Sequence, residues 1–220
     1  MPPTGADLSA DRAQALALTP VSRETAGRLD RFVALLLQRQ EITNLIGPAT
    51  IPRLWTRHVA DSLQLLALAP QARVWLDLGS GGGFPGLAMA CALADEPGAA
   101  VHLVESTGKK AAFLREVVRD LGLPAVVHAE RIEHFSAPND THMDVITARA
   151  VAPLTVLFGY VAPLLKTGAQ ALLPKGQDVE AELTEAAKYW KVQADLVPSR
   201  TSAAGRIVVV RALARRDAKG

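Results

Sequence analysis

Cysteine is almost missing from this chain of 220 residues, in which Cys91 is the single example. One thiol cannot close an internal disulfide, and a lone cysteine argues against a zinc site built from several of them. The neighbours of Cys91 are small and apolar, which predicts that it is buried as a hydrophobic side chain. We therefore expect a protein of the reducing cytoplasm.

Long hydrophobic runs are missing as well. The longest apolar stretch, VAPLTVLFGYVAPLL at residues 151–165, contains two prolines and is shorter than the roughly 20 residues that a membrane-spanning helix needs. The N-terminus, MPPTGADLSADRAQ, has no basic start followed by an apolar block, so we expect no signal peptide. The sequence thus predicts neither a membrane span nor export.

An excess of one charge is also missing, because 24 lysines and arginines stand against 22 aspartates and glutamates. A net charge of +2 does not indicate a polyanionic partner, so any nucleic-acid contact has to rest on local clusters. One cluster is TGKKAAFLREVVRD at residues 107–120, where interleaved acids make a solvated, salt-bridged helix an equal alternative. The other is the C-terminal stretch from Ser199, with six basic residues against Asp217 alone.

Apolar residues are plentiful, and their spacing indicates the fold. Residues 29–37 and 51–70 repeat apolar side chains every three or four positions, which predicts helices. Beyond Pro70, short β-branched runs alternate with segments long enough for a helix, which predicts a doubly wound, Rossmann-like α/β fold with a parallel sheet. The predicted strands are ARVWLDLG, AAVHLVES, AVVHAE, MDVITARA and GAQALLP, followed by the hairpin-like pair KVQADLVPS and GRIVVVRAL.

The segment WLDLGSGGGFPGLAM, residues 75–89, places five glycines within eight positions behind a predicted strand. The chain must turn sharply there into a helix that begins near Pro85, and glycine allows both positive φ and the close approach of a ligand. Ligands of open α/β sheets bind at this carboxyl edge of the strands. A tight turn without a ligand would need fewer glycines. The segment therefore predicts a ligand site.

Two classes of ligand fit such a loop. A dinucleotide places its pyrophosphate on the helix N-terminus and pairs its ribose with an acid about 20 residues further on, whereas S-adenosylmethionine has no phosphate. Glu105 ends the second predicted strand and would accept the ribose hydroxyls of either ligand, unless it is simply a solvated strand end. Asp77 favours S-adenosylmethionine, because an acid two residues before Gly79 would balance an ammonium group but repel a pyrophosphate.

Six segments together carry a specific resemblance. They are NLIG at 44–47, RHVADS at 57–62, DLGSGGGFPGL at 77–87, ESTGKKAAFLREV at 105–117, ITARAVAPL at 146–154 and PKGQ at 174–177. In register from about residue 30 to residue 211, the chain closely resembles the glucose-inhibited division protein B family, which is the ribosomal RNA small subunit methyltransferase G group. The combination of segments is far more specific than any one of them.

The resemblance implies an S-adenosylmethionine-dependent class I methyltransferase fold with a helical N-terminal cap. The change of period at Pro70 and the basic C-terminus divide the chain into a cap over residues 1–70, a methyltransferase domain over residues 71–213 and a basic tail over residues 214–220. The implied cofactor is S-adenosyl-L-methionine, and the implied acceptor is N7 of one guanine in 16S ribosomal RNA or in the assembling small subunit. Carried over by position, the cofactor contacts are Gly79, Phe84, Glu105, Ile132, Glu133 and Arg149, and the residue patterns add Gly81 and Asp77. Gly82 and Gly83 depart from relatives that often have alanine or proline at the first position.

Three basic residues are candidates for positioning substrate. Arg149 interrupts an apolar run, so it needs an anionic partner, which is the cofactor carboxylate, an RNA phosphate or an acid of this chain. His58 lies in RHVADS, whose helix face borders the reaction cleft according to the resemblance, although residues four apart there could simply pair with each other. Lys175 ends a predicted strand, where an RNA phosphate contact and a solvated lysine are equally open. We assign no catalytic residue and no metal ligand.

The implied chemistry makes modest demands on side chains. Guanine N7 has an available lone pair, so its methylation needs alignment of the reacting atoms and exclusion of water rather than a general base. N7 lies in the deep groove of A-form RNA, so the target guanine is expected to be unpaired or flipped out. A small-molecule methyltransferase, an NAD-dependent oxidoreductase and a non-catalytic ribosome-binding module stay open as alternatives. We expect a monomer.

Overall fold

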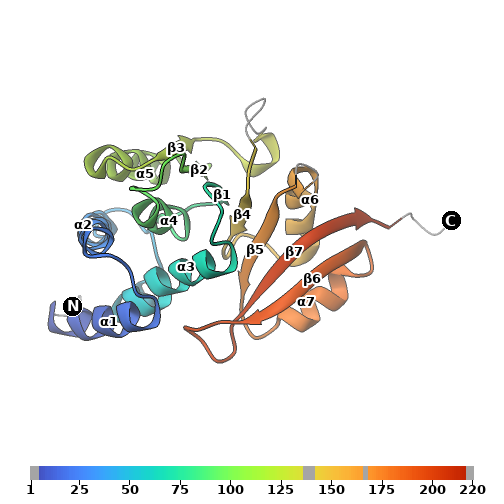
Figure 1. Cartoon of the computed structure of the whole chain (residues 1–220), viewed down its shortest axis with the longest axis horizontal. Coiled ribbons are helices and arrows are strands. Elements are labelled where there is room, and N and C mark those ends of the chain that lie inside the picture. Colours follow the sequence, from blue (N-terminus) through green and yellow to red (C-terminus); the bar gives the residue numbers. More distant parts are fainter. Residues whose placement is uncertain (1–4, 136–141, 166–167, 217–220) are drawn as a thin grey trace.

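A computed structural model describes residues 5–135, 142–165 and 168–216 of the chain (Figure 1). The end of the predicted basic tail, residues 217–220, lies outside the described residues. The described part has a central sheet with helices on both sides, and its N-terminal helices lie together against one of these sides (Figure 1).

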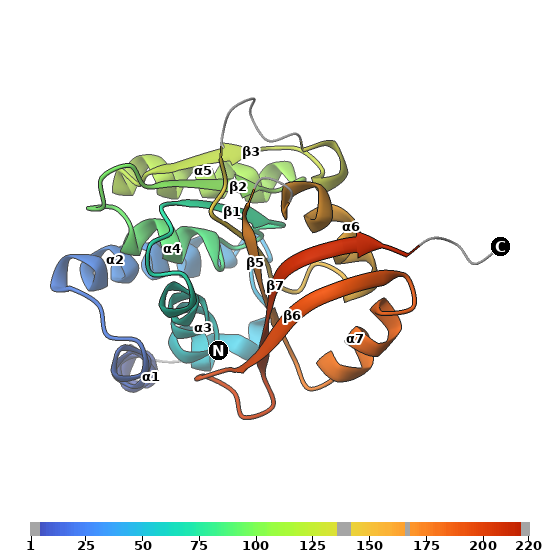
Figure 2. The same ribbon diagram turned by 45° about the vertical axis from the view of Figure 1, so that its right-hand side comes forward.

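Seven strands of the described chain form one sheet in the order β3-β2-β1-β4-β5-β7-β6. The strands from β3 to β5 are parallel neighbours, and β7 runs antiparallel between β5 and β6. Every predicted strand is therefore confirmed, including the C-terminal pair, which projects from one side of the sheet (Figure 2). The strands are β1 (Val74–Leu78), β2 (Ala100–Val104), β3 (Ala125–His128), β4 (Val145–Ala148), β5 (Gln170–Lys175), β6 (Trp190–Pro198) and β7 (Arg206–Arg215).

Alternate residues of the central strands face two different cores, which explains their continuous apolar runs. Trp75 and Leu103 belong to the core that contains α4 (Gly86–Ala92) and α5 (Gly108–Leu121). Leu76 and Ile146 belong to the core on the opposite face, beneath α6 (Leu154–Leu165) and α7 (Val179–Ala186). Cys91 is fully buried in α4, as predicted, and its burial raises the thiol pKa to about 12.

The N-terminal cap is helical, but less regular than its periodicity predicts. It comprises α1 (Gly5–Leu18) and α2 (Arg23–Gln40), then η1 (Pro48–Arg53), η2 (Trp55–Ala60), α3 (Asp61–Leu63) and η3 (Gln64–Leu68). Residues 51–70 are thus a succession of 3₁₀, π and α turns. The buried carboxylate of Asp11 accepts hydrogen bonds from the backbone N–H groups of Trp55 and Thr56, so an acid of α1 holds the start of the π turn.

The cap and the sheet share one core. Phe32 of α2 packs against Phe84 of the glycine segment, with ring centroids 5.0 Å apart, and Trp55 and Phe113 belong to the same buried cluster. The division of the chain at residue 70 stays a prediction. No helix of the described chain is both long and apolar enough to cross a membrane.

Candidate functional site

A cavity of about 930 Å³ opens at the carboxyl edge of the parallel strands. Its lining comes from the segments that follow the five parallel strands β1 to β5, from residues 45–50 and 57–61 of the cap, and from the loop between β6 and β7. Ligand pockets usually measure about 300 to 1,000 Å³, so this cavity can hold more than one small group. The predicted carboxyl-edge site therefore coincides with a real hollow.

The glycine segment turns as its sequence predicts. Gly79, Gly81 and Gly83 have φ values of 74°, 53° and 95°, a region that side chains disfavour. Gly86, at the start of α4, has no room for a side chain, because an added Cβ would lie 2.2 Å from Leu103 Cδ2. Gly79 and Gly81 line the cavity, as does Phe84.

Asp77 lies behind the glycine segment rather than on the cavity surface. It is 1% exposed, and its Oδ2 accepts a hydrogen bond from the Gly86 N–H at 3.0 Å while Oδ1 accepts one from Thr147 Oγ1 at 3.2 Å. Burial raises the pKa of Asp77 to about 6, against the lowering effect of these donors. The carboxylate thus holds the turn into α4, and its role opposite a ligand ammonium stays a prediction.

Glu105 binds the glycine segment from the end of β2. Its Oε2 accepts a hydrogen bond from the Gly81 N–H at 2.9 Å, and its Oε1 accepts one from the Thr107 N–H at 2.6 Å. The side chain is buried yet lines the cavity. Each carboxylate oxygen has a further lone pair, so Glu105 can still accept a hydroxyl from a ligand.

Ile132 and Glu133 begin η4 (Ile132–His134), and the two face differently. Ile132 lines the cavity, as the resemblance implies for a residue against an adenine. Glu133 is exposed, and its Oε1 accepts a hydrogen bond from Tyr160 Oη at 2.9 Å. Its own backbone N–H and the Tyr160 hydroxyl both donate to the carboxylate and lower the Glu133 pKa. Glu133 is not among the described residues that line the cavity, so its predicted ligand contact has to come through its backbone or a rotated side chain.

Arg149 extends from the end of β4 toward the cap. Its Nη2 donates to His58 Nδ1 at 2.7 Å, and its Nη1 donates to Asp61 Oδ2 at 3.4 Å. The guanidinium lies 5.6 Å from the ring centroid of Phe84. Burial lowers the Arg149 pKa, and the Asp61 charge opposes that effect. Among the partners predicted for Arg149, the described chain supplies the internal acid, and the cavity position leaves the guanidinium accessible to a ligand anion.

The bond from Arg149 fixes the tautomer of His58. Because a guanidinium only donates, Nδ1 of His58 accepts, and the ring proton resides on Nε2, which lies 2.8 Å from Thr50 Oγ1. Burial and the Arg149 charge lower the His58 pKa to about 3. His58 is therefore a neutral cavity residue whose ring stacks on Phe84 with centroids 5.1 Å apart.

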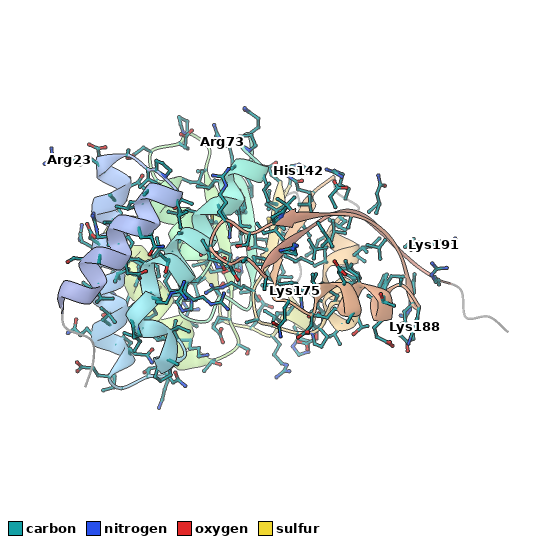
Figure 3. All side chains as sticks on the ribbon, turned by 90° about the horizontal axis from the view of Figure 1, so that it is seen from below. Arg23, Arg73, His142, Lys175, Lys188 and Lys191 are labelled. Carbon is teal, nitrogen blue, oxygen red and sulfur yellow. The ribbon has the colours of Figure 1, made fainter. Side chains whose placement is uncertain are left out.

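Lys175 is not a solvated strand end. Its Nζ donates to Glu182 Oε2 at 2.7 Å and to the Ala152 carbonyl at 2.8 Å, and the side chain is 12% exposed. Figure 3 shows it near the middle of the molecule, far from Lys188 and Lys191 at the end of the hairpin. Besides Arg149, the lining contains the cations Lys175, Arg57, Lys110 and Arg206, and the Arg57 carbonyl accepts a hydrogen bond from Arg149 Nη1 at 3.1 Å.

Sequence reasoning missed a second set of polar residues. Asp61 and Gln64 are 7% and 3% exposed, and both bind the loop between β6 and β7. The predicted pair of Arg57 with Asp61 is replaced by Arg149 with Asp61, and Ser62 Oγ donates to the His58 carbonyl at 2.6 Å rather than to its ring. No cluster of three potential metal ligands occurs in the part of the chain that the structure describes.

Comparisons with known proteins agree with this geometry. Residues 26–214 match the GidB family, described as rRNA small subunit methyltransferase G. A ribosomal RNA small subunit methyltransferase G of Bradyrhizobium sp. strain BTAi1 is 59% identical over 210 residues, which cover 96% of this chain and 95% of that protein. One of the same name from Nitrobacter hamburgensis is 61% identical over 209 residues, covering 95% and 80%.

A solved structure shows the same fold. The O-methyltransferase TomG of Streptomyces achromogenes, in complex with SAM, superposes with a TM-score of 0.58 at 15% identity, covering 93% of this chain and 96% of that one. This likeness confirms the predicted class I methyltransferase fold. The predicted resemblance is confirmed as well, and the chain belongs to the rRNA small subunit methyltransferase G family.

Proposed function

We propose that this protein transfers the methyl group of S-adenosyl-L-methionine to N7 of a guanine in 16S ribosomal RNA. Its family is one of small-subunit ribosomal RNA methyltransferases, and the observation that carries the proposal is the cavity. One wall of the cavity presents glycine backbone and a carboxylate, and other parts of the lining present cations and a small-residue loop. A nucleoside cofactor and a nucleotide acceptor need two such surfaces facing one gap.

The residues of the first wall fit the cofactor. Glu105 has lone pairs to accept ribose hydroxyls, Ile132 offers an apolar surface to adenine, and Gly79 and Gly81 allow a ligand to approach the backbone. Arg149 has a guanidinium that can pair with a carboxylate. When bound, the cofactor supplies a methyl group on a positively charged sulfur, which departs as a neutral thioether.

The side chains around the cavity fit an acceptor atom that carries no proton, so that none has to be removed before methyl transfer. His58 is neutral and already accepts a hydrogen bond from Arg149, and Lys175 is held by Glu182, so neither is free to act as a base. N7 of guanine needs none, because its lone pair forms the new bond to carbon directly. The protein then contributes by orienting the acceptor and excluding water.

Methyl transfer to unmethylated small-subunit RNA tests the proposal. Purified protein with S-adenosylmethionine labelled in its methyl group should yield labelled 7-methylguanosine after digestion of the RNA. Label on another base would contradict the N7 assignment, and label transfer only to small molecules would contradict the RNA acceptor. Using naked RNA and assembled subunits in parallel identifies which of the two is the substrate. A Lys188→Ala variant is a suitable control, since Lys188 pairs with Glu185 at the surface of the molecule.

A further inference from the structure

The loop of residues 199–205, which joins β6 to β7, forms one side of the cavity. Ser199, Ser202, Ala204 and Gly205 line it, so the loop presents small side chains to the gap. In the sheet order, β7 lies three strand positions from β1, which corresponds to about 14 Å. The loop therefore stands across the cavity from the glycine segment and away from the cofactor residues.

The loop is internally closed. Ser199 N–H donates to the Gly205 carbonyl at 3.1 Å, and Gly205 N–H donates to the Ser202 carbonyl at 3.0 Å. Gly205 is buried, and an added Cβ would lie 2.9 Å from Ser199 Cβ. The loop thus has a defined shape, but these bonds do not fix where that shape lies relative to the rest of the cavity.

Two buried side chains of the cap supply that placement. Asp61 Oδ1 accepts a hydrogen bond from Thr201 Oγ1 at 2.6 Å. Gln64 Oε1 accepts one from the Arg200 N–H at 2.8 Å, and its Nε2 donates to Ser199 Oγ at 3.2 Å. In Figures 1 and 2 the loop lies beside α3, although α3 belongs to the N-terminal cap and the loop lies near the C-terminus of the chain.

The two cap residues also bind each other. Gln64 Nε2 donates to Asp61 Oδ1 at 2.8 Å, so one amide orients the carboxylate that holds Thr201. The other oxygen of Asp61 faces Arg149, which belongs to the cofactor side. Asp61 therefore joins the two sides of the cavity through different oxygens, and a change at Thr201 leaves its contact with Arg149 in place.

We propose that Asp61 and Gln64 are positioning residues that hold the 199–205 loop as the acceptor wall, and so determine the KM for RNA without contributing to cofactor affinity through that loop. The inference rests on the proposed function, because it takes RNA as the acceptor. A loop held at three points presents one surface to the target nucleotide. Without these hydrogen bonds the loop samples several positions, and part of the free energy of RNA binding is lost because the loop has to be ordered again.

Thr201→Val tests this, because valine keeps the shape and removes the hydroxyl that binds Asp61, together with its contact to Ser199 Oγ inside the loop. Loss of a hydrogen bond to a charged group should raise the KM for RNA about tenfold. We expect the Kd for S-adenosylmethionine, measured by calorimetry without RNA, to stay within about twofold of wild type. Thr201→Ser, which restores the hydroxyl, should restore the KM. Thr184→Val is the matched control, because its hydroxyl bonds the Glu180 carbonyl on α7.

Hydrogen exchange separates positioning from folding. In Thr201→Val the amides of Arg200 and Gly205 should exchange faster, while those of β1 and β4 remain protected. Gln64→Met removes the other contacts with the loop and should also raise the KM for RNA. Because both changes release the same loop, the variant that carries both should lose less binding free energy than the sum of the two single losses.

Two results would overturn the inference. One is an unchanged KM for RNA in a Thr201→Val protein whose loop amides do exchange faster. The other is an equal loss of cofactor and RNA affinity, which would mean that the loop does not serve the acceptor separately. A wild-type protein that methylates no RNA at all would instead contradict the proposed function, so the two failures are distinguishable.

Discussion

The two sides of the cavity are built in different ways. The side that we propose for the cofactor includes the lining residues 79–82 and Phe84, in a segment whose shape depends on glycine. The acceptor side combines a cap segment with a loop more than a hundred residues later, joined by buried side chains such as Gln64 and Ser199, which are 135 positions apart. A surface made of backbone tolerates few side chains, whereas a surface made of tertiary contacts depends on individual hydrogen bonds.

Gly86→Ala should disrupt the cofactor side most severely. The new Cβ would lie 2.2 Å from Leu103 Cδ2 and 2.7 Å from Asp77 Oδ2, so the turn into α4 has to move. We expect loss of cofactor affinity by about 100-fold or more, measured by calorimetry. Gly27→Ala is the control, because Gly27 lies in α2 with open space around it and should lose no activity. Normal cofactor binding by Gly86→Ala would mean that the turn is not the binding element.

Arg149→Ala should affect both sides at once. The change removes a guanidinium that binds His58 and Asp61 and leaves the buried Asp61 carboxylate without its cation. Loss of one partner of a largely buried pair predicts a fall of about 100-fold in kcat/KM. Arg149→Lys keeps the charge but not the two-pronged geometry, so it should recover only part of the activity. Equal activity of the alanine and wild-type proteins would remove Arg149 from the site.

His58→Gln should change how stability depends on pH. The His58 pKa is about 3 in the folded protein and close to 6.5 when unfolded, so the unfolded chain binds more protons between these values. The contribution of His58 to the free energy of unfolding is complete above about pH 6.5 and is lost as the pH falls toward about 3. Asp77 acts in the opposite direction, because its raised pKa of about 6 favours the fold at low pH, but it is present in both proteins.

Urea unfolding of wild type and His58→Gln across this pH range measures the difference. The free energy of unfolding of the glutamine variant should fall less steeply on acidification, because glutamine can accept from Arg149 without titrating. Parallel profiles would show that the pKa of His58 does not change on folding.

Arg57→Ala should have the smallest effect, confined to the acceptor side. Arg57 is an exposed cation on the cavity lining, so it can contact a phosphate without supporting the fold. We expect the KM for RNA to increase about two- to fivefold. The slope of the logarithm of the RNA binding constant against the logarithm of the salt concentration should become shallower by about one unit. Cofactor affinity should not change, and an unchanged salt dependence would exclude a phosphate contact.

The same contrast explains what could be predicted from sequence. The glycine segment and Glu105 were found because local patterns determine a strand, a turn and the residue at a strand end. Asp77 was predicted to face a ligand ammonium, which stays a prediction, and its burial behind the turn depends on α4 and β4, which no local pattern places. The irregular turns of residues 51–70 follow from packing against α1, where Asp11 holds the π turn.

The acceptor side was much less accessible to sequence reasoning. Asp61 and Gln64 lie on a predicted helix, where spacing suggests partners three or four residues away. Their actual partners are Arg149, Arg200 and Thr201, which the sheet order brings close. The signal that could have found them is a group of polar residues between Arg57 and Gln64 in a segment whose apolar periodicity predicts burial, since buried polar groups need partners from elsewhere in the chain.

The position of β7 between β5 and β6 determines when the protein becomes complete during its own synthesis. Chains emerge from the ribosome N-terminus first, so the cap, the glycine segment and β4 are available long before the last strand. The 199–205 loop takes its place only after β7 has been inserted into the sheet. The residues that we propose for the methyl donor are therefore all synthesised before β7, whereas the acceptor side is complete only when nearly the whole chain has been translated.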